Sequence, residues 1–183
     1  MSEPLIPVLT NVGLAAIANA QGTGLAAVID RIAIGRGVID GLGVYRGYIP
    51  PKTATALRGE MARIPILQGQ RRDPSGFSIL GVLPKESAGT YPVNEVGFFL
   101  ENGTLLAVWS IPDYPLAYKT TLADLELGFD LLLEAIPTSA LNITVLNPDV
   151  PDYAGAIAEG IAMHARLFIE QSRINRRLDA AKI

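Results

Sequence analysis

Acidic side chains are the first residues in this sequence that could do chemistry. Asp124, Glu126 and Asp130 alternate with apolar residues between positions 124 and 134. Two carboxylates that face each other across a cleft can hydrolyse a glycosidic bond. Acidic residues opposite an apolar face are also the ordinary solvent side of a half-buried sheet. Because no cleft is evident from the sequence, the alternation favours an exposed strand face, and a hydrolase of cell-wall polymer has the least support.

A glycine-rich stretch is the second candidate. Gly35-Arg36-Gly37 is followed by Gly41 and Gly43, which superficially suggests a phosphate-binding loop. The Gly-Lys-Ser/Thr ending of such a loop is missing, and no convincing helix follows whose N-terminus could hold a phosphate. This pattern argues against a nucleotide site.

Histidine and cysteine chemistry is almost excluded by composition. The chain has one histidine, His164, and no cysteine, so disulfides, thiol catalysis and thiolate metal sites are ruled out together. Because the expected β domain contains no histidine, none of its serines can belong to a Ser-His-Asp triad. A metal held by His164 from three copies on a threefold axis is physically possible, but a packed histidine is favoured. We therefore predict no catalytic residue, no cofactor and no metal.

Composition points instead to association between subunits. The hydrophobic fraction is 49% and the mean hydropathy is +0.31, which is more apolar material than a lone small domain needs. The net charge of −3 gives no general attraction for nucleic acid. Apolar stretches are interrupted well before bilayer length, and the N-terminus lacks a signal sequence. The expectation is a chain made in the host cytoplasm, with no membrane span.

The N-terminal part predicts a short helix and then a strand. Thr10 or Asn11 can cap a helix that runs to Ala20, and the glycines of residues 21–24 end it. Residues 28–35 are rich in β-branched side chains and predict a strand. Residues 35–51 are expected to form a glycine-rich loop.

Further strand signals follow at short spacing. They cover residues 61–67, where Pro65 suggests an edge or a bulge, then 77–83, 125–133 and 143–146. Two apolar runs, 96–100 and 105–109, flank Asn102-Gly103, the pair that favours a type I′ hairpin turn.

The character of the chain changes after the Pro/Asp-rich segment 147–151. Residues 152–183 contain no proline and are compatible with a helix. An apolar stripe recurs at spacings of four and three, as in a coiled coil. Basic residues outside the stripe could bind nucleic acid or an acidic partner surface, but a solvated coiled-coil exterior is the favoured interpretation. The predicted oligomer or partner interface consists of Tyr153, Ile157, His164, Leu167, Gln171, Ile174 and Leu178.

Together these signals predict an α+β fold. Residues 1–148 would form a mainly antiparallel, β-sandwich-like domain with a short N-terminal helix. Residues 149–183 would form a long C-terminal helix for oligomerisation or partner binding. Polar layers at His164 and Gln171 favour three strands in a coiled coil, because a threefold axis leaves room for small polar clusters.

Several segments resemble one known family in order and spacing. Residues 9–20 (LTNVGLAAIANA) are similar to an opening T-x-A-G-x-A-x-I-A-x-A helix, and residues 32–35 (IAIG) to the I-A-V-G strand that follows. Residues 94–108 (NEVGFFLENGTLLAV) are similar to an E-x-G-L-Y-D-x-x-G-x-L-I-A-V hairpin. Residues 115–119 (PLAYK) and the 125–133 strand complete the pattern. The chain thus resembles the N-terminal module of phage tail-collar fibre proteins of contractile tails and R-type pyocins.

This resemblance implies a structural virion protein without enzymatic residues. Its β-rich domain would dock on the baseplate, usually as a homotrimer. Because family fibres usually continue into a long shaft and tip whereas this sequence stops at Ile183, a short tail fibre or adaptor is expected. Its partners would be itself, baseplate proteins and another fibre or receptor-binding protein, at the virion tail.

The alternative is a carbohydrate-binding module that recognises the host surface. Aromatic rings can stack on sugar rings, although core and interface packing explains the same residues equally well. The candidate aromatic residues are Tyr45, Tyr48, Tyr91, Trp109, Tyr114 and Tyr118.

The predicted interface can be tested by placing a charge in its apolar stripe. We expect Ile174→Asp to weaken self-association while leaving the β domain folded, because the aspartate would lie unpaired in a buried seam. Native mass spectrometry of the variant would give the oligomer mass. An unchanged mass would show that Ile174 is not in the interface.

Overall fold

The computed structural model describes residues 6–72, 76–87, 89–132 and 140–145. The chain divides into two units, Met1–Pro148 and Asp149–Ile183. All of the second unit lies outside the described residues.

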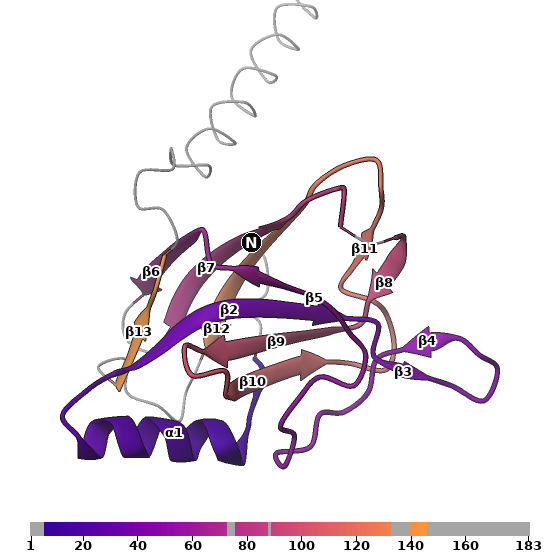
Figure 1. The fold of residues 1–183 in the computed structure, drawn as a ribbon. Helices are drawn as coiled ribbons and strands as arrows, with labels where there is room; N and C mark the ends of the chain where they lie inside the picture. The colour runs from indigo at the N-terminus through magenta and orange to yellow at the C-terminus, as the bar shows by residue number, and fades with distance from the viewer. Residues whose placement is uncertain (1–5, 73–75, 88, 133–139, 146–183) are drawn as a thin grey trace, which may run out of the picture. The chain divides into compact units, whose positions relative to one another are not determined.

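The predicted α+β class is wrong. The described residues form a mostly antiparallel β domain with one short helix, α1 (Asn11–Gly22) (Figure 1). The α+β class depended on a long C-terminal helix over a stretch that lies outside the described residues. Hydrogen bonds between strands hold most of the described chain together. Its fold class is therefore mainly β.

The main sheet is built around one long strand, β2 (Ala27–Gly35). It pairs with β9 along one side, and with β13 and β5 along successive parts of the other side. Of the pairings between described strands, the β2–β13 pairing alone is parallel. The other strands of this sheet are β1 (Val8–Leu9), β10 (Leu105–Ser110), β9 (Glu95–Leu100), β13 (Leu141–Ile143) and β5 (Glu60–Pro65).

A second sheet of three antiparallel strands has the order β12 (Leu125–Leu132), β7 (Gly76–Leu83) and β6 (Gln68–Arg72). Two short antiparallel pairs complete the described strands. They are β8 (Tyr91–Val93) with β11 (Ala117–Lys119), and β3 (Val38–Ile39) with β4 (Tyr45–Arg46).

The hydrophobic core lies where side chains of the two larger sheets meet. Phe98 from β9 and Phe129 from β12 make an edge-to-face contact with ring centroids 5.6 Å apart. Leu127, Phe129 and Leu131 are buried in this core, whereas Glu126 is exposed. The alternation read from the sequence of this strand is therefore confirmed.

The opposite face of the main sheet is also covered. Because neighbouring residues of a strand point to opposite faces, Phe99 lies in a second apolar cluster with Leu57 and Val108. The guanidinium carbon of Arg63 lies 3.6 Å from the centroid of the Phe99 ring. Burial on both faces explains why every residue of β9 is buried.

Helix α1 begins where the sequence predicted. The Gly13 amide donates to Thr10 Oγ1 (2.9 Å), which caps the first turn. The same hydroxyl donates to the Leu105 carbonyl (2.5 Å), and the Thr10 amide donates to the Leu106 carbonyl (3.0 Å). One threonine therefore both starts the helix and fastens it to β10.

The glycine-rich segment ends the helix as predicted, but the last helical residue is Gly22 and not Ala20. Gly24 has a left-handed φ of 76°. The Leu25 amide donates to the Ala20 carbonyl over 2.9 Å, which is the bond that commonly closes a helix before a left-handed glycine.

The β9–β10 hairpin is confirmed, but its predicted type I′ turn is wrong. Within this turn Gly103 has a positive φ (80°) but Asn102 does not, since no described non-glycine residue has one. The Gly103 amide donates to the Leu100 carbonyl (2.8 Å), and the Thr104 amide donates to Asn102 Oδ1 (3.0 Å). The longer connection needs one left-handed residue instead of two.

Other expectations need smaller corrections. The last described strand covers Leu141–Ile143 and not 143–146. The expected loop 35–51 contains the β3–β4 hairpin. Pro65 does lie at the end of an edge strand, since among the described strands β5 pairs with β2 alone. No helix within the described ranges is long and apolar enough to cross a membrane.

Two glycines of α1 provide a matched test of how closely the helix packs. A Cβ added at Gly13 would lie 2.7 Å from Leu106 Cα, whereas one at Gly22 would meet nothing within 4 Å. We expect Gly13→Ala to lower the free energy of unfolding by about 1–3 kcal/mol through overpacking. Gly22→Ala should change it by less than about 1 kcal/mol. Urea unfolding measures both, and equal stabilities would contradict the close approach of α1 to β10.

Candidate interaction surfaces and the buried carboxylate

One carboxylate lies fully buried in the middle of the fold. Glu95, the first residue of β9, is 0% exposed. Two backbone amides donate to its Oε1, from Gly37 (3.2 Å) and Gly59 (2.6 Å). The Arg58 amide (3.0 Å) and the Tyr48 hydroxyl (2.7 Å) donate to its Oε2. All four donors come from the segment between β2 and β5.

Neighbouring polar groups extend this network. The Ser110 hydroxyl donates to the Asn94 carbonyl (2.7 Å) and accepts from the Tyr48 amide (2.9 Å). The Asn94 side-chain amide donates to the Arg36 carbonyl (2.7 Å). A Cβ on Gly35 would lie 2.3 Å from Glu95 Oε1, so a glycine there leaves room for the carboxylate.

The geometry of Glu95 is structural and not that of a catalytic base. A carboxylate has about four favourable acceptor sites, and four donors already occupy them. Burial, and next the hydrogen bond to Glu95, raise the pKa of the Tyr48 hydroxyl, so this group stays protonated and donates. Among the described residues, no group of three or more His, Asp or Glu side chains is placed to hold a metal.

The β3–β4 hairpin, residues 38–46, projects from the main sheet and is called the finger here (Figure 1). Asp40 organises it. Its Oδ1 accepts from the amides of Leu42 and Val44, each over 2.9 Å, and its Oδ2 accepts from Arg46 Nε at 2.6 Å. The hydrogen bond from Arg46, followed by that from the Val44 amide, lowers the pKa of the Asp40 carboxyl. The finger thus has a defined shape.

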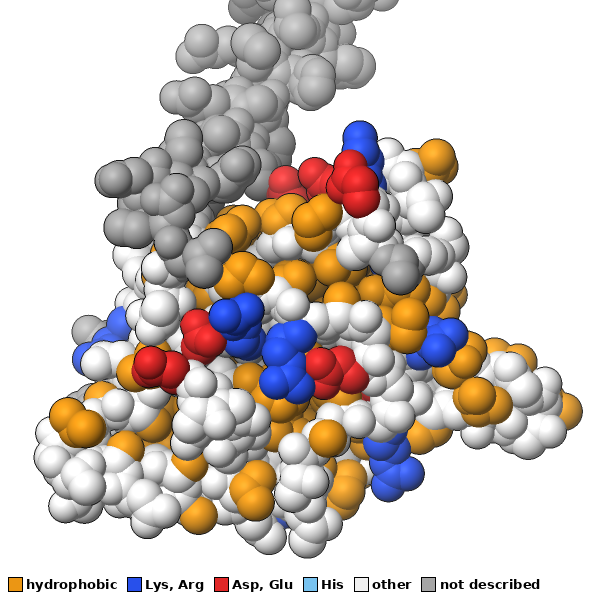
Figure 2. Space-filling model, viewed as in Figure 1, with side chains coloured by type: hydrophobic (Ala, Val, Ile, Leu, Met, Phe, Trp, Pro, Cys, Tyr) orange, Lys and Arg blue, Asp and Glu red, His pale blue; other side chains and the backbone are white. Residues whose placement is uncertain are grey.

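Large apolar side chains are exposed on the finger. Ile39, Leu42 and Val44 are 60%, 85% and 47% exposed. Figure 2 shows apolar side chains along this projection. At its base, the Arg36 guanidinium lies 4.2 Å from the centroid of the Tyr45 ring. Such exposure on an ordered projection is typical of a protein contact surface.

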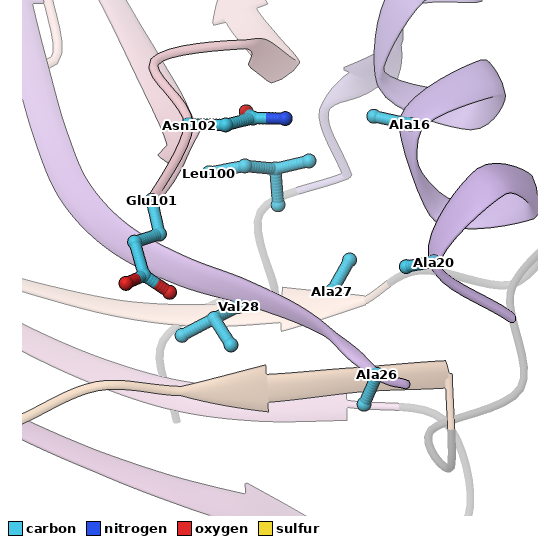
Figure 3. A pocket seen from close by; sticks show the side chains of 8 residues that line it. All are labelled: Ala16, Ala20, Ala26, Ala27, Val28, Leu100, Glu101 and Asn102. Carbon is cyan, nitrogen blue, oxygen red and sulfur yellow. The ribbon is translucent and has the colours of Figure 1, made fainter. Parts of the chain in front are cut away.

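A second surface lies between α1 and the β9–β10 hairpin and is called the helix groove here. It consists of two adjoining hollows of about 410 and 530 Å³ that share Ala16, Ala20 and Asn102. The methyl groups of Ala16 and Ala20 point from α1 toward Leu100 and Ala27 (Figure 3). Helix α1 contains no charged residue. Among the described residues, Glu101 is the one charged residue that lines either hollow.

Residues 1–145 match the model for the N-terminal part of phage tail-collar fibre proteins. The chain belongs to the phage tail-collar fibre family. Its role is that of a structural component of a phage tail fibre. Comparisons with curated proteins and with solved structures returned no match.

Most aromatic residues considered for sugar binding are packed within this tail-fibre domain. Tyr91 is buried, and Tyr45, Tyr48 and Trp109 are partly buried. Tyr114 and Tyr118 are exposed. Stacking on a glycan is therefore best supported at these two rings.

The described acidic residues of the β12 region have different surroundings. The Asp124 carboxylate accepts from the Lys85 amide over 2.7 Å, and Glu126 is exposed. Asp130 is partly buried. Neither hollow of the helix groove includes any of them. The predicted interface residues lie outside the described ranges: Tyr153, Ile157, His164, Leu167, Gln171, Ile174 and Leu178.

Sequence reasoning missed both Glu95 and the finger. A lone acidic residue at the start of the apolar run 96–100 was a usable signal, because a charge in a buried strand needs partners. The finger was hidden in a glycine-rich stretch. The residue that could have indicated the finger is Asp40, which lies two residues before an exposed leucine. At this spacing an aspartate accepts backbone amides in a turn.

Glu95 can be tested against an exposed glutamate on another strand. We expect Glu95→Ala to lower the free energy of unfolding by about 3 kcal/mol or more, because four donors lose their acceptor. Glu126→Ala should change it by less than about 0.5 kcal/mol. Urea unfolding gives both values. Hydrogen exchange at the Gly59 amide should also accelerate in the Glu95 variant, and equal stability of both variants would refute the structural role of Glu95.

Proposed function

We propose that the chain is a tail-fibre or adaptor subunit that attaches to the baseplate of a contractile tail and links it to other fibre or receptor-binding components. The family match over residues 1–145 carries this proposal. The finger and the helix groove support it, because both offer apolar, ordered surfaces suited to protein partners.

We further propose that the chain works as a homotrimer. The resemblance to tail-collar fibres supports the number three. Self-association is also supported by the apolar side chains of the finger, since Ile39 and Leu42 are more than half exposed.

Host-surface recognition is the alternative function. Tyr114 and Tyr118 are exposed and could stack on sugar rings. A glycan array probed with the full chain separates the two functions. Binding to defined glycans would favour host recognition, and no binding would leave attachment as the function.

The position of the chain in the tail tests the attachment directly. Antibodies against the full chain, labelled with gold, would be applied to intact tails and examined by electron microscopy. We expect gold at the baseplate, because in this proposal the domain shared with the family is the part that attaches there. Gold confined to the distal ends of fibres would contradict attachment and support host recognition. Tails that lack the chain provide the control for nonspecific labelling.

A further inference from the structure

The finger and the helix groove are complementary in shape and polarity. The finger is a convex projection with a bulky tip, and Leu42 at that tip is 85% exposed. The helix groove is hollow because alanines line it where larger side chains could stand, among them Ala15, Ala16 and Ala20. Asp40 and Arg46 neutralise each other within the finger, so the tip itself presents apolar side chains to a neutral helix.

The charges around the two surfaces are also complementary. Arg36, Arg46 and Arg58 on and beside the finger, with Asp40 and the buried Glu95, give a formal charge of +1. The helix groove carries one formal negative charge, from Glu101. Opposite signs at the margins favour and orient an apolar contact of this kind.

The two surfaces lie on different sides of the domain. The β3–β4 hairpin points away from the sheet at the end of β2, whereas α1 lies along the main sheet beside β10 and the start of β2 (Figure 1). A finger therefore meets a groove only on another copy. A contact between two different surfaces of identical chains closes into a ring when the rotation between copies allows it.

We propose that the finger of one copy inserts into the helix groove of the next copy, and that three such contacts close a ring. This inference rests on the proposed self-association of the tail-fibre subunit. It assigns Leu42 as the residue that fills the groove and Ala15, Ala16 and Ala20 as the small residues that admit it.

Cysteine trapping tests this contact, since the full chain has no cysteine of its own. Leu42→Cys and Ala20→Cys are placed in one chain and oxidised. A disulfide forms readily only between Cβ atoms about 3.5–4.5 Å apart, so we expect a covalent trimer on a non-reducing gel. Leu122→Cys with Ala20→Cys is the matched control, because Leu122 is 88% exposed in another loop. This pair should stay uncrosslinked.

Disruption of either surface gives an independent measurement. We expect Leu42→Asp and Ala15→Arg each to raise the dissociation constant of the oligomer about tenfold or more. Leu122→Asp should leave it unchanged. Analytical ultracentrifugation of the full chains gives the constants, and circular dichroism verifies that each variant folds.

The outcomes distinguish a failure of the finger contact from a failure of the proposed homotrimer. A wild-type chain that is monomeric at micromolar concentration would overturn both the homotrimer and the finger contact. A trimeric wild type, with no trapped disulfide and no effect of Leu42→Asp, would overturn the finger contact and leave the homotrimer standing. Covalent ladders longer than three copies would overturn the closed ring.

Discussion

The burial of the Glu95 carboxylate is the constraint on which much of the described fold depends. Taking an ion out of water costs several kcal/mol unless other groups replace its hydration. Here the replacement comes from three backbone amides and one tyrosine hydroxyl, all between Gly37 and Gly59. The chain can therefore bury this charge only if the long connection from β2 to β5 returns to the sheet. That return also brings Leu57 over the second apolar face.

The glycines of this connection have a physical explanation in the same carboxylate. The stretch at Gly35 and Gly37 resembled a phosphate-binding loop because both kinds of loop expose backbone amides to an anion. In this protein the anion is internal. The space beside Gly35 is occupied by Glu95 Oε1, so an added ligand would have to displace the protein's own side chain.

Features set by neighbouring residues could be predicted from the sequence, whereas those set by distant contacts could not. The Thr10 cap, the left-handed Gly24 and the alternation of β12 depend on residues a few positions apart, and the structure confirms them. Glu95 finds its partners 36 to 58 positions away. The type I′ turn failed because dipeptide preference does not fix the length of a connection. The α+β class failed because it depended on a periodic stretch outside the described residues, whereas the described chain is mostly paired strands.

Burial of the main sheet on both faces separates folding from association in this domain. Phe98 and Phe99 point to opposite faces, and each lies within an apolar cluster. Neither face of β9 is therefore left as an exposed apolar surface. Exposed apolar side chains lie instead on structures attached to the sheet, such as Leu42 on the finger. Because Asp40 stabilises the finger locally, its tip can change without altering the core. A tail-fibre domain built this way can keep its fold while its contacts with neighbouring subunits diverge.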